Sequence, residues 1–452
     1  MTLPSASSGA GGEVVVFPVS FPQRRIWLFE QLQPGEIFFH MPWGVHIYGA
    51  VDFAVLEQVF HEIIRRHEVL RTRFIAIKGE PHQIIEPELK LSLEPINLNI
   101  LPAAKLSGEV ERHIQENTLG LFDLKNGPLV RAKLLRIAAD HSLLLVAMHH
   151  IIFDGWSMSI FMREATSLYK SFRGGGPSHL PELPIQYGDY AVWQASQMDG
   201  PIMGRQMDYW KKQLASLHMV ELPADYPRPA RHVAPAGFVE FVIPEDLASQ
   251  LKELANQESA TLYMVLLAGF QTLLHHVTGS SDISVATTVA GRTQPETENL
   301  IGCFINTLLL RTNFAGAPVF RDLLRQVKKI ALEAYENQHV PLEVVADAIQ
   351  PARDPRRAPL YNIGFVMQNT PPRKGELEGV SMELVSFPGS AARVDLSVSL
   401  RETATAVAGH ARYNADLFMN ETIRKLLDSF ILTLRSMVAA PDARVTDLRI
   451  AQ

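Results

Sequence analysis

The stretch His149-His150-Ile151-Ile152-Phe153-Asp154-Gly155 decides how this 452-residue sequence is interpreted. It follows the apolar run Leu143–Met148, which predicts a strand buried on both faces. Successive strand side chains point to opposite faces, so one histidine can face a cleft while its neighbour packs inward. Gly155 permits a positive φ and a close approach by a ligand. A helix is expected next, so its N-terminal amides lie beside a histidine that can transfer protons near neutral pH.

Asp154 has two possible roles. It can orient a histidine as in a catalytic triad, or it can hold the turn by pairing with an arginine. The chain has no Gly-x-Ser-x-Gly elbow, and Cys303, its only cysteine, stands in the apolar run Ile301–Leu310, typical of a buried small hydrophobe. We therefore favour direct transfer without a covalent enzyme intermediate, and we predict that Asp154 pairs with Arg292.

A structural histidine pair at a strand end is the alternative interpretation. The pair His275–His276 illustrates it, because it ends a predicted helix and has no Asp-Gly at the matching offset. Composition alone would produce the full HHxxxDG pattern on the order of once in a thousand chains of this length. The complete motif therefore favours a functional site.

Composition limits the class of protein. Hydrophobic residues make up 47% and charged residues 20% of the chain, which is typical of a globular protein. The formal net charge of −6 argues against nonspecific nucleic-acid binding, and we interpret the basic cluster Arg353, Arg356 and Arg357 as a solvated loop. The single cysteine, the lack of a signal sequence and the lack of a long apolar run predict a cytoplasmic protein. We expect no nucleic-acid or membrane partner and no metal.

Helix and strand patterns occur in both halves, so the predicted fold class is α/β or α+β. Residues 1–16 are expected to be disordered. The run Gly174-Gly175-Gly176-Pro177 predicts a linker that divides the chain into domains of residues 17–180 and 181–452. Apolar residues at helical spacing predict helices over Val55–Arg66, Ile160–Phe172, Pro244–Gln257, Thr261–Val277, Phe320–Asn337 and Glu421–Val438.

With these residues in view, the sequence resembles the condensation domains of nonribosomal peptide synthetases. Seven motifs stand in the family's order across roughly residues 17 to 450, at Ser20–Leu28, Arg66–Phe74, Met148–Ser157, Tyr187–Trp193, Ile301–Leu308, Asn337–Glu343 and Arg353–Leu360. The resemblance implies two lobes, each like chloramphenicol acetyltransferase. It further implies a V-shaped pseudo-dimer with the active site in a tunnel between the lobes.

The resemblance also implies roles for individual residues. In the family the second histidine of the motif is functional, which corresponds to His150, and the backbone of Gly155 lies near the reacting carbonyl. The residues expected to have structural roles are His149, Asp154 and Arg292. The candidate residues of the substrate tunnel are Trp156, Ser157 and Asn306.

The implied activity is acyl transfer. A peptidyl carrier protein in trans would supply an acyl or aminoacyl thioester on its phosphopantetheine arm, which is substrate rather than a permanently bound cofactor. The acceptor would be a small-molecule or carrier-bound amine or alcohol, and the product an amide or ester in antibiotic biosynthesis. The ends of the chain favour a freestanding enzyme, similar to the condensation enzymes of enediyne antibiotic pathways, over an excised domain. A two-lobed pseudo-dimer is expected to be a monomer.

Two other functions within the same family stay open. One is a noncatalytic module that recruits tailoring enzymes to a carrier protein, and the other is an epimerisation domain. The retained histidines and the continuation Asp154-Gly-Trp-Ser-Met158 favour bond formation. Cys303 in place of a usual aromatic, Phe153 in place of a small serine, and Arg393-Val-Asp395 in place of Lys-Phe-Asp leave the fine specificity open.

Overall fold

The structure is a computed structural model, and it describes residues 15–198, 200–229, 234–349, 360–368, 376–377, 380–387, 391–392 and 394–450. The chain forms two compact units. The first unit contains Met1–Gly200, Ala290–Ile305 and Thr370–Gly389, and the second contains Pro201–Val289, Asn306–Asn369 and Ser390–Gln452. The first unit therefore extends past the glycine-rich linker, and two later segments return to it. The predicted domain boundary at residue 180 does not assign these two later segments to the first unit.

A six-stranded sheet forms the centre of the first unit, in the order β12-β13-β2-β7-β6-β5. Its strands are β2 (His40–Tyr48), β5 (Ile96–Asn97), β6 (Val130–Ala138), β7 (His141–His149), β12 (Glu376–Leu377) and β13 (Val380–Ser386). A second, three-stranded sheet contains β1 (Val15–Pro18), β3 (Thr72–Ile77) and β4 (Glu80–Ile85).

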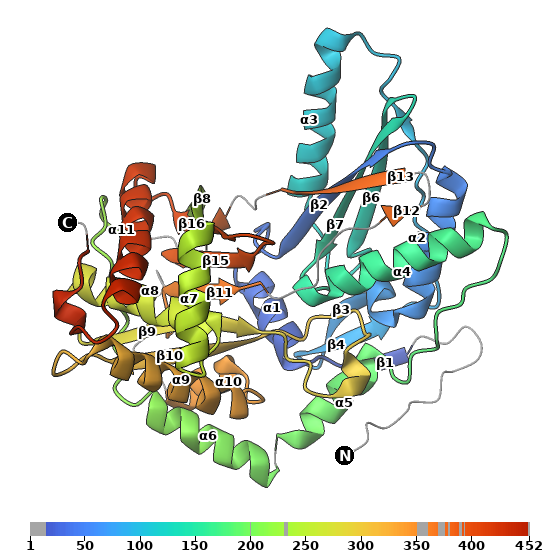
Figure 1. The fold of residues 1–452 in the computed structure, drawn as a ribbon. Coiled ribbons are helices and arrows are strands. Elements are labelled where there is room, and N and C mark those ends of the chain that lie inside the picture. Colours follow the sequence, from blue (N-terminus) through green and yellow to red (C-terminus); the bar gives the residue numbers. More distant parts are fainter. Residues whose placement is uncertain are drawn as a thin grey trace. The chain divides into compact units, whose positions relative to one another are not determined.

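Helices cover both faces of the six-stranded sheet. Helices α2 (Phe53–Arg66) and α4 (Gly155–Arg173) lie on one face and α3 (Ala103–Leu119) on the other (Figure 1). Strand β7 supplies both cores, because Leu144, Val146 and Met148 pack on the α2 and α4 side while Leu143 and Leu145 pack on the α3 side. The prediction of a strand buried on both faces is confirmed.

Helix α1 (Phe21–Leu32) lies against the turn that follows the two histidines. A capping box starts it: the backbone N of Gln23 donates to Oγ of Ser20, and the backbone N of Ser20 donates to Oε1 of Gln23 at 3.0 Å. The side-chain amide of Gln23 then donates to the carbonyl of Ile151 at 3.2 Å. The remaining helices of this unit are α5 (Tyr187–Gln197) and the 3₁₀ turns η1 (Glu68–Arg71) and η2 (Pro295–Thr297).

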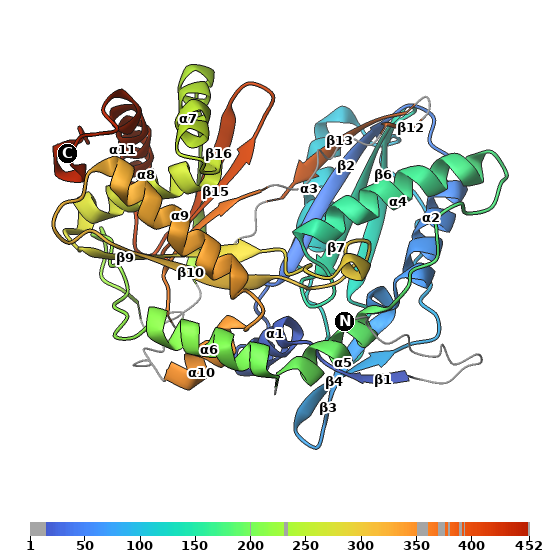
Figure 2. The ribbon, with the colours of Figure 1, turned by 60° about the horizontal axis from the view of Figure 1, so that its bottom comes forward.

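The second unit has a seven-stranded sheet in the order β10-β9-β11-β15-β16-β8-β14. Its strands are β8 (Ala234–Ile243), β9 (Asp282–Val289), β10 (Asn306–Asn313), β11 (Ile363–Met367), β14 (Ala391–Ala392), β15 (Leu396–Glu402) and β16 (Val407–Asn414). Its helices are α6 (Pro201–Gln213), α7 (Glu245–Gln257), α8 (Leu262–Thr278), α9 (Phe320–Glu336), α10 (Leu342–Ile349) and α11 (Asn420–Ala439), with the turn η3 (Val445–Asp447). Helix α8 packs against α7, α9 and α11 (Figure 2).

The six helices predicted from apolar spacing are all present as α2, α4, α7, α8, α9 and α11, and the mixed α/β class is confirmed. In the described part of the chain no single helix is long and apolar enough to cross a membrane. The pair α7 and α8 passes the same test only together, with a bend of 106° between them, and α8 is buried along most of its length.

Candidate functional site

The histidine motif spans the end of β7, a tight turn and the start of α4. His149 is the last residue of the strand, and its backbone N donates to the carbonyl of Leu129 at 3.0 Å. The backbone N of His150 donates to the carbonyl of Phe39 at 2.7 Å, so strand pairing continues through both histidines. The backbone N of Ile152 bonds back to the carbonyl of His149, which closes the turn.

His150 carries a neutral imidazole at physiological pH. Its side chain is only partly exposed, and burial lowers its pKa below the ordinary value. Hydrogen bonds to the backbone carbonyls of His150 itself and Phe153 raise the pKa, but they do not outweigh burial.

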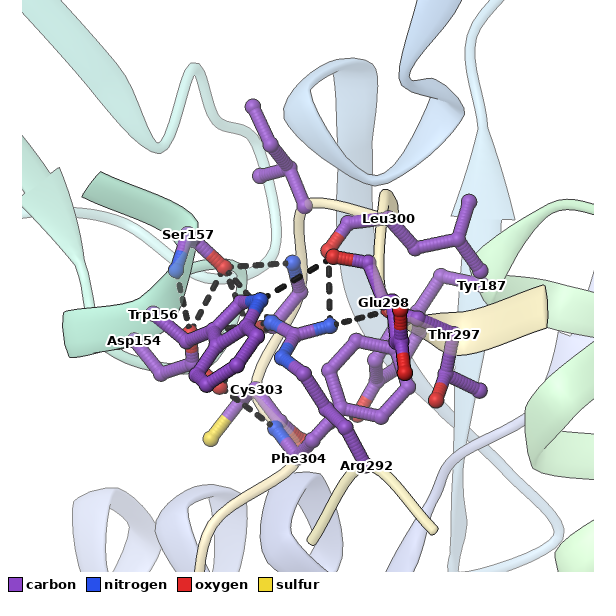
Figure 3. Close-up of polar contacts among 12 residues, drawn as sticks. Asp154, Trp156, Ser157, Tyr187, Arg292, Thr297, Glu298, Leu300, Cys303 and Phe304 are labelled. Carbon is purple, nitrogen blue, oxygen red and sulfur yellow. Dashed lines mark hydrogen bonds and ion pairs between the residues drawn. The ribbon is translucent and has the colours of Figure 1, made fainter. Parts of the chain in front are cut away.

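Asp154 is the N-cap of α4 and is fully buried. Its Oδ1 accepts from the backbone N of Ser157 at 2.8 Å and from Oγ of Ser157 at 2.7 Å, and its Oδ2 accepts from the backbone N of Phe304 at 3.1 Å (Figure 3). Nη2 of Arg292 lies 3.0 Å from Oδ1. The structure therefore brings Asp154 and Arg292 together, as expected from the sequence.

Arg292 holds the segment that contains it. Its Nη1 donates to the carbonyls of Thr297 at 2.7 Å and Leu300 at 2.8 Å, and its guanidinium lies 4.0 Å from the ring centroid of Phe304. The Asp154 and Arg292 side chains are 0% and 2% exposed. This ion pair ties residues 290–305 to the start of α4, which is a structural task.

A model of the family described as Condensation domain matches residues 15–452. The chain belongs to the condensation domain family. It is 38% identical over 436 residues to a linear gramicidin synthase of Brevibacillus parabrevis, covering 95% of this chain and 6% of that protein. The condensation domain thus spans a small part of this curated relative.

Two solved structures share the fold over nearly the whole condensation domain. The X-domain from teicoplanin biosynthesis is 25% identical, with a TM-score of 0.87 and coverage of 99% of each chain. The SgcC5 protein from Streptomyces globisporus is 25% identical, with a TM-score of 0.77, covering 94% of this chain and 100% of that one. That structure holds a naphthyl ethanediol and sucrose, according to its description.

The sequence predicts that Trp156, Ser157 and Asn306 line a substrate tunnel. Ser157 does not face open space. Ser157 is fully buried, and its Oγ lies 3.0 Å from both the carbonyl and the backbone N of Gly302. The prediction is wrong for Ser157, because the residue after the N-cap turn is drawn into the Asp154 network. Trp156 is partly exposed, and its Nε1 donates to the carbonyl of Glu298 at 3.0 Å.

Asn306, the third candidate, belongs to the second unit. Its Nδ2 donates to the carbonyls of Gln338 and Val340, both at 2.8 Å, and its Oδ1 accepts from the backbone N of Leu342 at 3.3 Å. These bonds fasten the chain between α9 and α10 to the start of β10. A tunnel-lining role for Asn306 stays a prediction.

Gly155 is the first residue of α4, and its backbone does not have the positive φ that the sequence suggests. The expected reason for glycine is therefore wrong. A Cβ built at this position would have no neighbour within 4 Å, so the space in front of the backbone is open. Its amide belongs to the helix N-terminus, where a developing negative charge is stabilised.

Cys303 is fully buried and lies beside His150, with 3.8 Å between Sγ and Nδ1 of that histidine. Burial raises its pKa far above the ordinary range of a thiol. Its carbonyl accepts a hydrogen bond from the hydroxyl of Tyr187. Cys303 is thus a packed thiol and not a thiolate nucleophile, as expected from the sequence.

The second sequence motif contributes a buried ion pair behind the site. Nε of Arg66 and Nε2 of His67 lie 3.3 Å and 3.1 Å from Oε2 of Glu164, which is on α4. Nδ1 of His67 accepts from the backbone N of Ile301 at 3.2 Å. This cluster ties α2, α4 and the segment 290–305 together. The motif Arg353–Leu360 falls almost wholly, and the three-arginine cluster wholly, outside the described residues.

Sequence reasoning misses the groups around His149. Nε2 of His149 lies 3.4 Å from Oε1 of Glu30 on α1, and its ring lies among those of Phe39, His40 and Phe122. His149 is 1% exposed, and burial lowers its pKa to about 3. Nothing in the local pattern of α1 marks Glu30, because its contact is with a residue more than a hundred positions away.

Proposed function

We propose that this condensation domain transfers an acyl or aminoacyl group from a carrier-protein phosphopantetheine thioester to an amine or alcohol. The observation that carries the proposal is His150: a partly exposed imidazole at the N-terminal end of α4, which burial keeps neutral near pH 7. The family supports the same activity. The phosphopantetheine arm enters as part of the substrate, and the donor carrier protein and a cytoplasmic location are parts of the proposal.

The proposed step is a direct displacement. The nitrogen or oxygen of the acceptor attacks the thioester carbon, a C–N or C–O bond forms, and the C–S bond breaks. Nε2 of His150 orients the nucleophile and takes its proton, which then passes to the departing thiolate to give the free thiol. Negative charge on the carbonyl oxygen lies toward the amide of Gly155 at the start of α4, where the helix dipole favours it.

A covalent enzyme intermediate is not part of the proposal. The thiol of Cys303 is fully buried, and burial raises its pKa far above neutrality. The hydroxyl of Ser157 is fully buried, and its hydrogen bonds go to Asp154 and Gly302. Neither side chain can present a nucleophile to a thioester.

The test is His150→Ala, assayed by mass spectrometry with acyl-loaded carrier proteins and a panel of amines and alcohols. We expect turnover to fall about 10²- to 10⁴-fold, the range for loss of a proton-transferring side chain. His276→Ala is the matched control, since that histidine bonds to the carbonyl of Thr272 at a helix end and should not affect turnover. Full turnover by the His150 variant refutes the proposal. Carrier binding by the wild-type chain without any product favours a recruitment role instead.

A further inference from the structure

Glu30 lies near the C-terminal end of α1 with its carboxylate turned toward the histidine motif. Oε1 of Glu30 is 3.4 Å from Nε2 of His149, and the two side chains are 13% and 1% exposed. Within the described part of the chain this oxygen is buried and forms no hydrogen bond. A buried carboxylate oxygen is costly unless a donor faces it. The proton state of His149 therefore decides whether this contact is favourable.

The other ring nitrogen of His149 fixes that proton state. The backbone N of Ile151 donates to Nδ1 of His149 at 3.2 Å, so Nδ1 is an acceptor. The ring is neutral because burial lowers its pKa to about 3. A neutral imidazole carries one proton, which must then sit on Nε2 and point toward Glu30.

A closer pair of the same kind occurs in this unit, and it forms a hydrogen bond, which Glu30 and His149 do not. Nδ1 of His67 accepts from the backbone N of Ile301 at 3.2 Å, while its Nε2 lies 3.1 Å from Oε2 of Glu164. In both places a glutamate on a helix faces the Nε2–H of a buried histidine whose other nitrogen holds a backbone amide. The pair at Glu164 has the shorter contact, so it serves as an internal reference for the pair at Glu30.

The pair of Glu30 and His149 adjoins the turn that contains His150. Helix α1 reaches Ile151 by two routes, because Gln23 donates to its carbonyl at 3.2 Å and Glu30 faces the histidine that accepts its amide. His150 stands between His149 and Ile151. We propose that Glu30 is a positioning residue that acts through His149 to hold the functional imidazole in place. This inference rests on the proposed function of His150.

Burial and one neighbouring histidine set the charge of Glu30 at neutral pH. Burial raises the pKa of Glu30 to about 7, and His40 on β2 lowers it in part. Burial lowers the pKa of His40 to about 4, and His149 on β7 and Arg131 on β6 act in the same direction. Of this cluster, Glu30 is the group that titrates near pH 7. When it takes up a proton it loses its charge, and a neutral carbonyl oxygen in place of a carboxylate then faces the Nε2–H of His149.

This predicts a specific pH dependence of transfer. Turnover should fall as the pH drops through about 7, because a neutral carboxyl attracts the Nε2–H of His149 less strongly than a carboxylate and so holds the ring less firmly. The pKa of His150 is lowered from 6.5, so its own loss of activity comes at a more acidic pH. A pH profile of kcat should therefore show an inflection near 7 that does not belong to His150.

The first experiment compares Glu30→Gln and Glu30→Leu in the full chain. Glutamine is a neutral acceptor like the protonated carboxyl and cannot titrate, so we expect kcat at pH 8 to fall to the level that wild type has below the inflection, with no inflection near 7. Leucine removes the acceptor, so we expect kcat to fall at least tenfold at every pH with little change in KM. Glu80→Gln, at an exposed surface pair with Arg24, is the matched control and should keep the inflection. Persistence of the inflection in Glu30→Gln overturns the proposal.

The second experiment does not depend on turnover. Nitrogen-15 NMR of labelled imidazoles reports the tautomer directly, and we expect His149 and His67 to be protonated at Nε2 at pH 8. Leucine at position 30 should change the signal of His149 and leave that of His67 unchanged. Protonation of His149 at Nδ1 refutes the inference even if His150 proves essential. Conversely, an active His150→Ala variant refutes the proposed function and leaves the tautomer result standing.

Stability gives a third, independent measurement. A carboxyl whose pKa is raised to about 7 in the folded chain takes up protons on folding, so its contribution to stability is lost as the pH rises from 4.5 through 7. Glu30→Gln should therefore have a higher Tm than wild type at pH 8, by about a few degrees, and the difference should disappear near pH 4.5. An equal Tm at pH 8 contradicts a buried carboxylate at this position.

Discussion

Replacing Asp154 with alanine should unfold the first unit before it affects the chemistry. The carboxylate accepts from the backbone N and the hydroxyl of Ser157, from the backbone N of Phe304 and from Arg292. Alanine removes the N-cap of α4, which costs about 1 kcal/mol. It also leaves the guanidinium of Arg292 buried without its counter-ion.

The second loss is the larger one. Breaking a buried ion pair by removing one partner costs about 3–5 kcal/mol, because the remaining charge stays buried. Arg292 keeps the carbonyls of Thr297 and Leu300 as acceptors, and the two losses share one network and are not additive. We therefore expect about 3–5 kcal/mol in total for Asp154→Ala. At about 2–4 °C per kcal/mol for a unit of this size, Tm should fall by about 6–20 °C.

The assay is urea unfolding followed by tryptophan fluorescence. Only Trp210 lies in the second unit, so the signal is dominated by the first. Asp246→Ala, which removes an exposed pair with Arg435, is the control and should change the free energy of unfolding by less than about 1 kcal/mol. Suppose Asp154→Ala were as stable as wild type but lost as much turnover as His150→Ala. Asp154 would then act on the reacting groups, and the structural assignment would be refuted.

Three further predictions separate packing from chemistry. Gly155→Ala should change the free energy of unfolding by less than about 1 kcal/mol, since its Cβ meets no neighbour and alanine favours helix, yet kcat/KM should fall if substrate uses the open space. Gly302→Ala should instead destabilise the chain by at least about 1–3 kcal/mol, because its Cβ would lie 2.1 Å from Cδ2 of Tyr187. In urea titrations, equal stability of the two variants would contradict this packing. Cys303 should not react with a thiol reagent in the native chain and should react once unfolded; rapid native labelling would show an accessible thiol.

Local periodicity predicts the helices whose buried faces are apolar. The expected helix Phe320–Asn337 is observed as α9, Phe320–Glu336, and β7 contains the whole predicted apolar run. Helix α4 begins five residues before the expected start, because Asp154 caps it and Gly155 already belongs to its first turn. Helix α3 is absent from the predicted helices although Leu106, Val110 and Ile114 recur at helical spacing and pack against the sheet.

The pairing of strands that lie far apart in the chain leaves no periodic pattern in the sequence. Strand β13 lies in a segment that returns to the first unit and pairs antiparallel with β2, with Met382 opposite Ile47. A strand pattern specifies which face is apolar but not which distant strand it pairs with. The contact between Glu30 and His149 escapes prediction for the same reason. The expectation for Ser157 is wrong because a hydroxyl just after a motif suggests a substrate contact, whereas its hydrogen bonds turn it inward.

In the sequence, the spacing of His150 and Asp154 resembles that of an acid–base pair. In the structure, the charge of Asp154 and the burial of the ring have opposite effects on the pKa of His150. The charge of Asp154 raises the pKa of His150, whereas Arg25 lowers it and burial lowers it most. A base that must be neutral near pH 7 gains nothing from a carboxylate placed to charge it. The hydrogen bonds of the Asp154 carboxylate go to Ser157, Phe304 and Arg292 and not to the ring of His150. The aspartate is explained instead by the helix cap and by Arg292, which holds its charge away from the imidazole.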